Sequence, residues 1–299
     1  MASQERTMPF IKNLAASDRK TRTSALNSLR TFLSARQTAS ALTPLDTLKL
    51  WKGLFYALWM CDRAVPQQGL CADLAGLVHV LPPAAVVPWL RGFWATMARE
   101  WSSIDVLRLD KFLLLVRRVL GESLLWMKVR EEEEGGDEKK KGKKKAGRKE
   151  GGGGGGSRWN AERVEGIIGL LAEWPFVLED DSRLAQEDEP EEEEEEDEEM
   201  GTGTDGKKKK DSLSPRYVPV GLKLHVLDIW VDEAERVGLF PDDDDNDEAR
   251  DIVRRITELV ETLQRCTMST AVRIRSRQSL VDDRLPSSGQ SGQEDEDSD

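Results

Sequence analysis

Apolar residues recur along most of this chain at intervals of three and four, the spacing that places side chains on one face of an α-helix. One helix start is especially clear at Thr43-Pro44-Leu45-Asp46. Thr43 can cap the helix, Pro44 suits the first helical position, and Asp46 favours the positive helix end. Asp18 and Asn246 are similar capping candidates. The pattern predicts helices at 10–16, 18–35, 44–59, 65–81, 89–101, 104–128, 159–174, 220–237 and 248–266.

The helix predicted at 104–128 has two apolar stripes. Val106, Leu113 and Val116 lie on one stripe, and Phe112 and Leu115 lie on the other. A stripe this wide indicates burial on two sides, as in a stack of helix pairs. Strict alternation of polar and apolar residues, the sign of strands, is absent, and we find no clean repeat of fixed length. We therefore predict an all-α fold, an irregular HEAT-like α-solenoid of stacked helix pairs.

Two segments are almost purely charged residues, Gly and Ser, and cannot bury enough apolar surface to fold. We expect them to be disordered inserts that loop out of one continuous stack. The resulting division is an N-terminal helical stack at 1–128, a Glu/Lys/Gly-rich insert at 129–157, a continuing helix at 158–179, an acidic insert at 180–214, C-terminal helices at 215–268 and a disordered tail at 269–299.

The net charge of −12 conceals opposite charges in two parts of the chain. Residues 1–128 carry 17 Lys and Arg against 9 Asp and Glu, a net +8, which leaves −20 for the rest. A basic folded part with an acidic remainder fits an RNA-facing domain with solubilising segments. The simpler alternative is that basic residues only solvate the helices.

Cysteine usage and hydropathy indicate a soluble protein of a reducing compartment. The three cysteines have neither CxxC nor metal-ligand spacing, and the first residues do not resemble a signal peptide. The longest uncharged apolar stretch, 74–90, has 17 residues and contains three prolines. It is too short and too interrupted to span a bilayer, which needs about 20 residues.

The residues that could carry chemistry are few. His225 lies three residues before Asp228, but no third group stands at a useful spacing for a catalytic or metal site, and His79 stands beside a proline pair. We interpret His225 as a surface histidine on an acidic helix face. The six glycines at 151–156 lack the flanks of a phosphate-binding loop, and the acidic run at 187–199 lacks the pattern of a calcium loop. We predict no catalytic residue, no metal site, no cofactor and no small-molecule substrate.

Basic residues are the remaining candidates. Those on the predicted helices could form a ridge that contacts RNA phosphates, although ordinary charged outer faces would give the same pattern. The candidate phosphate contacts are Lys49, Lys52, Arg91, Arg99, Arg108, Lys111 and Arg118. A basic tract in the first insert favours nuclear import or RNA contact. Its basic residues are Lys139, Lys140, Lys141, Lys143, Lys144, Lys145, Arg148 and Lys149. The aromatics Trp51, Trp59, Phe93, Trp94 and Trp101 stand at helical spacing and are expected in the core rather than on base-stacking platforms.

Three segments together resemble the ribosomal RNA processing protein 1 family. They are 49–62, which reads KLWKGLFYALWMCD, 93–120, which begins FWATMAREW, and 221–233, which reads GLKLHVLDIWVDE. The resemblance covers roughly 8–128 and 159–265. It implies a helical protein of the nucleus and nucleolus that is associated with precursors of the large ribosomal subunit. The partners that it implies are precursor rRNA and proteins of the pre-60S particle.

The resemblance provides no catalytic residues to transfer, so the function expected is that of a non-catalytic assembly factor in precursor rRNA processing and 60S biogenesis. An alternative is a nuclear acidic chaperone or carrier of basic proteins, for which the run at 187–199 would be the binding element.

Overall fold

The computed structural model describes residues 10–14, 16, 18–35, 42–129, 158–178, 218–240 and 246–285. Within these residues every regular element is a helix, which confirms the all-α prediction. The α-helices are α1 (Phe10–Leu14), α2 (Arg19–Ser34), α4 (Pro44–Trp59), α5 (Ala64–Ala75), α6 (Pro83–Glu100), α7 (Leu109–Trp126), α9 (Ala161–Glu173), α11 (Val220–Arg236), α12 (Asp247–Cys266) and α13 (Thr270–Leu280); the 3-10 helices are η1 (Gly76–His79) and η2 (Trp101–Ser103).

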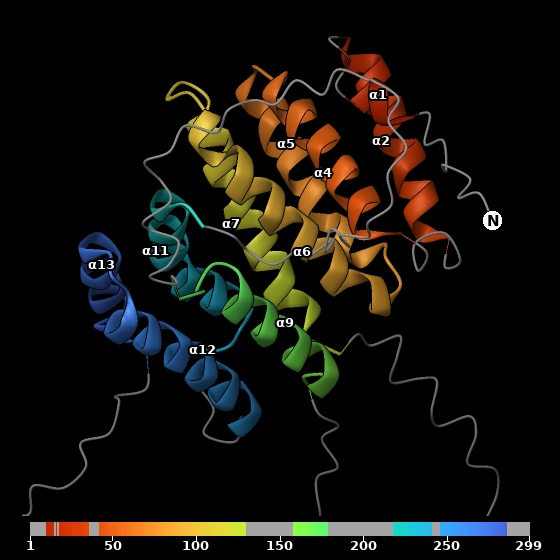
Figure 1. Cartoon of the computed structure of the whole chain (residues 1–299). Helices are drawn as coiled ribbons and strands as arrows, with labels where there is room; N and C mark the ends of the chain where they lie inside the picture. The colour runs from red at the N-terminus through yellow and green to blue at the C-terminus, as the bar shows by residue number, and fades with distance from the viewer. Residues whose placement is uncertain are drawn as a thin grey trace, which may run out of the picture.

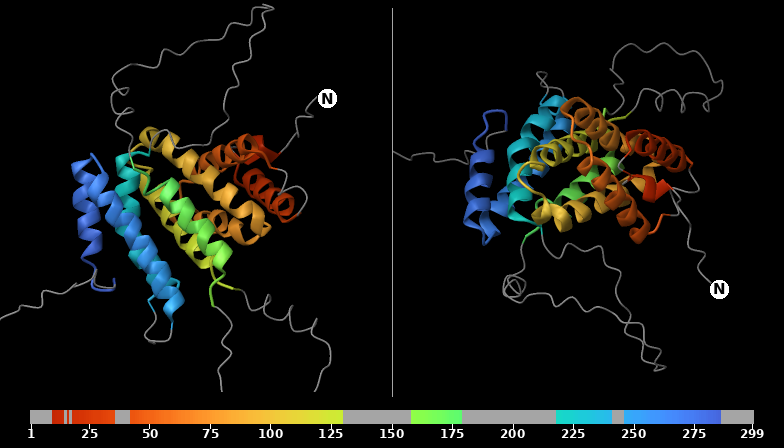
Figure 2. Two further views of the ribbon diagram at one scale, coloured as in Figure 1. Left: turned by 60° about the horizontal axis from the view of Figure 1, so that its bottom comes forward. Right: turned by 90° about the horizontal axis from the view of Figure 1, so that it is seen from above.

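The helices stack in approximate chain order, so the described part of the chain is elongated and solenoid-like (Figure 1). Helices α1 and α2 lie at one end, and α12 and α13 lie at the other, as the red-to-blue colouring shows (Figure 2). Between them α4 packs on α6, α5 on α7, α7 on α11, and α11 on α13, while α9 contacts α6 and α12. Each helix therefore buries its apolar face against near neighbours in the stack.

The capping residues expected from sequence begin three of these helices. Thr43 Oγ1 accepts a hydrogen bond from the Asp46 backbone N–H at 3.1 Å, and the Asp46 carboxylate accepts one from the Thr43 N–H at 3.1 Å. This reciprocal pair is a capping box. Asp18 caps α2 and Asn246 caps α12 through the same type of side-chain contact.

Most of the predicted core aromatics are buried. Trp51, Phe93 and Trp94 are each 2% exposed or less, whereas Trp59 and Trp101 are partly buried at the edge of the core. The Trp51 indole N–H donates to the carbonyl of Trp89 at 2.9 Å, so its polar atom is satisfied inside the core. The ring contacts join α4 to α6.

The helix predicted at 65–81 is α-helical only to Ala75 and continues as η1. Two further helices start five or six residues from the predicted position. Pro83 is tolerated at the start of α6 because the first helical N–H has no intrahelical partner, and Pro88 lies inside the same helix, so α6 begins six residues earlier than expected. Helix α7 begins at Leu109 rather than at 104. The residues before it form a turn in which Val106 is 81% exposed. Leu113 is also only partly buried, and so the first predicted stripe is shorter than expected.

The residues that flank the first insert are joined to each other. The Val129 N–H donates to the Arg158 carbonyl at 3.0 Å, and the Asn160 N–H donates to the Met127 carbonyl at 2.8 Å. These bonds surround an antiparallel bridge between Lys128 and Trp159. Val129 and Arg158, the described residues on either side of the first insert, are therefore held next to each other.

The prediction that the chain is disordered from residue 269 is wrong for residues 270–280. Residues 270–280 form α13, which packs on α11 and α12. Ser269 caps this helix, and Val272 is fully buried. The apolar face of α13 is narrow and alternates with arginines, so periodicity alone gave no clear helix signal.

Candidate nucleic-acid interface

Lys49 and Lys52 retain the position expected of phosphate contacts. Both are exposed on the outer face of α4, three residues apart, with the partly exposed Tyr56 one turn further along. The capping box fixes the start of this helix, and the burial of Leu50, Trp51 and Leu54 fixes its rotation. Neither lysine forms an ion pair with any residue that the structure describes.

Arg91 and Arg99 are engaged with acidic side chains. Arg91 on α6 forms a bidentate pair with Glu173 at the end of α9, with nitrogen–oxygen distances of 2.7–2.9 Å. It therefore links two helices of the stack. Arg99 is exposed and pairs with its neighbour Glu100 at 2.9 Å.

Arg108 and Lys111 lie near the start of α7, against the end of α4. The Arg108 guanidinium lies 4.8 Å from the centre of the Trp59 ring and pairs with Asp105. Lys111 is 5% exposed, and its Nζ donates to the carbonyls of Trp59 at 2.7 Å and Cys61 at 3.0 Å. Desolvation lowers the pKa of the Lys111 ammonium. Because this lysine satisfies carbonyls at the end of α4, its assignment as a phosphate contact is wrong.

Arg118 on α7 is exposed and forms no ion pair within the described ranges. Lys49, Lys52 and Arg118 are thus the exposed candidates that form no ion pair with a described residue. The basic tract at 139–149 lies outside the described residues. Of the seven helical candidates, three contact another helix, Arg99 pairs with its sequence neighbour at the surface, and three are surface cations without an ion pair among the described residues.

Both histidines are used in contacts between elements. His79 Nε2 lies 2.7 Å from the Glu122 carboxylate, joining η1 to α7. His225 Nε2 lies 2.9 Å from the carbonyl of Leu113, joining α11 to α7. His225 is half-buried rather than on the surface, and desolvation lowers its pKa. The interpretation of His225 as a surface residue is wrong because α11 packs between α7 and α13.

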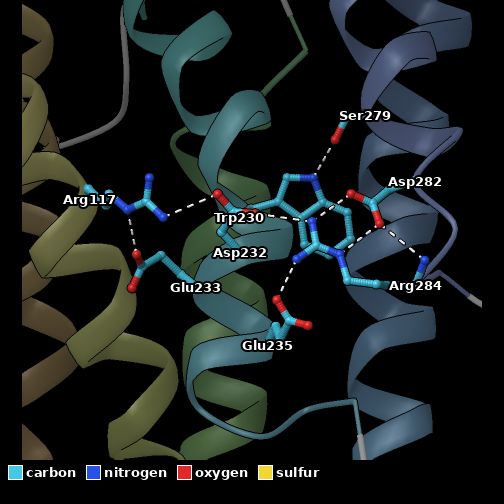
Figure 3. Close-up of polar contacts among 8 residues, drawn as sticks. All are labelled: Arg117, Trp230, Asp232, Glu233, Glu235, Ser279, Asp282 and Arg284. Carbon is cyan, nitrogen blue, oxygen red and sulfur yellow. Dashed lines mark hydrogen bonds and ion pairs between the residues drawn. The ribbon is translucent and has the colours of Figure 1, made fainter.

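The segment 221–233 contributes a row of polar side chains to the interfaces of α11 (Figure 3). Arg117 on α7 donates to Glu233 at 2.7 Å and to Asp232 at 3.1 Å. Glu233 is 3% exposed and also pairs with Arg236 at 2.6 Å. A buried carboxylate needs such paired cations, because its desolvation is otherwise costly.

The opposite side of α11 holds α13. The Trp230 indole N–H donates to Ser279 at 2.7 Å, and Arg284 contacts Asp232 at 3.0 Å and Glu235 at 2.6 Å (Figure 3). The hydrogen bond from Arg284 also lowers the pKa of Asp282. Sequence analysis did not identify Arg117 or Arg284. The signal that could have found them was the cluster of acids on α11, which requires basic partners on the helices beside it.

No group of histidine, cysteine and acidic residues suited to holding a metal ion occurs in the described ranges. Among the described helices, none combines the length and the apolar character needed to cross a membrane.

A sequence model of the family described as "Nucleolar protein, Nop52" matches residues 5–145. Ribosomal RNA processing protein 1 homolog A of Mus musculus is 45% identical over 122 residues, and that of Homo sapiens is 41% identical over 136 residues. Homolog B of Mus musculus is 38% identical over 126 residues. Over this region the chain is similar to proteins of the ribosomal RNA processing protein 1 family.

The matches to these family members cover 40%, 44% and 41% of this chain. They cover 25%, 30% and 17% of the respective relatives, so the chain spans less than a third of the length of each. The family match includes α4, with Lys49 and Lys52, and most of the stack up to the first insert.

Proposed function

We propose that this protein acts in the processing of precursor ribosomal RNA as an assembly factor of the large, 60S subunit. The match of residues 5–145 to a nucleolar protein family carries this proposal, and the names of the relatives support it. The implied location is the nucleolus within the nucleus. The implied partners are precursor rRNA and the proteins of pre-60S particles.

The role that we propose within such particles is that of a non-catalytic scaffold. An elongated helical stack offers a large surface relative to its volume, which suits simultaneous contact with several neighbours. Its buried polar side chains, such as Lys111 and Glu233, are engaged in holding helices together. This use of polar groups favours a binding role for the helical stack over a catalytic one.

We assign direct RNA contact to Lys49 and Lys52, with Arg118 as a further contact. Their exposure and their lack of ion-pair partners among the described residues support this assignment. Each phosphate contact releases condensed counterions, so binding should weaken as salt rises. The other four helical candidates are occupied by the acids or carbonyls described above.

The experiment compares the full chain with its Lys49→Glu, Lys52→Glu double variant. Tagged proteins are purified from cells at increasing salt, and the co-purifying precursor rRNA is measured. The double variant should retain less precursor rRNA at low salt and show a shallower dependence on salt, by about 0.7–0.9 in logarithmic slope for each phosphate that is no longer neutralised. An Arg265→Glu, Arg277→Glu variant is the matched control, because both arginines are exposed at the far end of the stack.

Three outcomes separate the alternatives. If the α4 variant and the control retain equal amounts of precursor rRNA, the RNA contact through α4 is wrong. If wild-type protein co-purifies with free basic proteins and no precursor rRNA, the chaperone alternative replaces the scaffold. Recovery of precursor rRNA with large-subunit assembly proteins would support the scaffold.

A further inference from the structure

A groove near the N-terminal end of the stack is lined by residues of α2, α4 and α5. Figure 1 shows where these helices lie in the stack. Its volume is about 400 Å³, within the range of about 300–1,000 Å³ usual for ligand pockets. The α4 side contributes the apolar residues Leu54, Ala57 and Cys61. None of the internal contacts or candidate phosphate contacts described above requires this space.

The α5 wall of the groove is unusually apolar for a surface. Val65 is 80% exposed, and Pro66 and Leu70 lie beside it. A Cβ atom added at Gly69 would have nothing within 4 Å, so the groove is open at this point. Exposed apolar surface of this kind is characteristic of a binding groove when polar residues surround it.

The α2 wall is basic. Arg19, Arg22 and Arg30 line it, and the acidic residue lining the groove is Asp73 on α5. A guanidinium nitrogen of Arg30 lies 3.6 Å from a carboxylate oxygen of Asp73 on the opposite wall, and the two side chains are 42% and 50% exposed. An ion pair this exposed is weak and can exchange partners at little cost. The charge of the rim therefore favours an acidic occupant, and the apolar floor favours aliphatic side chains.

We infer that this groove binds a short, acidic, amphipathic helix of another protein, with its aliphatic side chains against α4 and α5 and its carboxylates toward Arg19 and Arg30. The recognition mode is that of an apolar helix face laid between two helices, with anchors at i, i+3, i+4 and i+7. The acidic run of this chain at 187–199 is not the proposed occupant, because it has no aliphatic residue before Met200. This site is separate from Lys49 and Lys52 and does not depend on RNA contact.

The probe is a short fluorescein-labelled peptide with leucines at i, i+3, i+4 and i+7 and glutamates at most other positions, titrated with the full-length chain by fluorescence anisotropy. We expect saturable binding. Replacing the leucines by serine, or the glutamates by lysine, should abolish it. The Arg19→Glu, Arg30→Glu variant should bind about tenfold more weakly or worse, because it reverses the complementary charge. Asp73→Asn, which releases Arg30, should bind several-fold more tightly.

Gly69→Phe provides a steric test. The added ring would fill the open groove, and replacing a helical glycine does not by itself destabilise the fold. Peptide binding should be lost in this variant, while its thermal unfolding stays cooperative. Gly169→Phe is the matched control: Gly169 is also helical and exposed with nothing within 4 Å of an added Cβ, but it lies on α9.

Absence of binding to the wild-type chain, or equal binding by the Gly69→Phe and Gly169→Phe variants, would overturn the inference. So would binding that appears only after residues 187–199 are deleted, since that run would then be the occupant. The Lys49→Glu, Lys52→Glu variant should bind the peptide normally. Loss of precursor rRNA in that variant and loss of peptide binding in the Gly69→Phe variant are therefore separate results, and either proposal can fail alone.

Discussion

Single polar residues in this protein gain their roles from the helices packed beside them. Lys111 illustrates this, because its ammonium satisfies two carbonyls at the end of α4. His225 is a second case, held against the carbonyl of Leu113. In both, burial lowers the pKa of a basic side chain, so each residue contributes to the dependence of stability on pH.

The His225 contact predicts a loss of stability in mild acid. Because its pKa is lowered in the folded state, the unfolded chain takes up a proton first as the pH falls through about 6.5, and unfolding becomes easier. The loss should stop once the pH is below the folded-state pKa. Urea denaturation of the wild type and of His225→Gln across this range measures the effect. A stability difference between the two that does not vary with pH would contradict it.

At the scale of elements, close approach of helices depends on particular small residues. Gly92 on α6 faces Thr47 and Trp51 on α4. A Cβ atom at this position would overlap the Thr47 methyl group and lie 3.3 Å from Trp51 Cδ1. Thr47 is buried and β-branched, so it has little freedom to move away. The close approach of α4 and α6 therefore depends on Gly92.

Gly92→Ala should accordingly destabilise the fold by about 1–3 kcal/mol, despite the higher helix propensity of alanine. Chemical denaturation would measure this change. Gly169→Ala is the control, because an added Cβ there meets nothing within 4 Å. That control should be neutral or up to about 1 kcal/mol more stable. Equal effects at the two glycines would refute the close-packing argument.

The contacts between α11 and the C-terminal residues that include α13 give another prediction at this scale. Arg284→Ala removes the ion pairs to Asp232, Glu235 and Asp282, and should loosen α13 by about 1 kcal/mol. Amide hydrogen exchange should become faster in α13 and remain unchanged in α4. Arg277→Ala, at an exposed position of α13, should leave the exchange rates of α13 and α4 unchanged. Faster exchange throughout the stack would show that Arg284 has a wider role.

For the whole molecule, the residues that flank the first insert are hydrogen-bonded to each other. We therefore expect the helical stack to fold without the inserted sequence. Residues 131–156 should therefore be replaceable by a short Gly-Ser connection between flanks that already pair. The shortened chain should unfold in one transition, within about 2 °C of the wild type. Val116→Asp in the same background should abolish that transition, because Val116 is fully buried. Loss of cooperativity on shortening alone would mean that the insert supports the stack.

The amino-acid sequence by itself determined the helical class, the capped starts at Thr43, Asp18 and Asn246, and the helices on either side of residues 130–157. These features follow from local spacing and local hydrogen bonding, which neighbouring residues specify. The family resemblance was also present in the sequence, since it rests on long runs of residues.

Only the tertiary structure decided which basic residues remain at the surface. Arg91 and Lys111 have the same helical spacing as exposed cations, but their partners are distant in the sequence. Glu173 lies 82 residues after Arg91, and the carbonyls of Trp59 and Cys61 lie 52 and 50 residues before Lys111. It likewise decided that 270–280 is a helix, because α11 and α12 provide the surface on which Val272 is buried. The groove between α2 and α5 has the same origin. Packing between distant segments, which periodicity does not encode, determines all three.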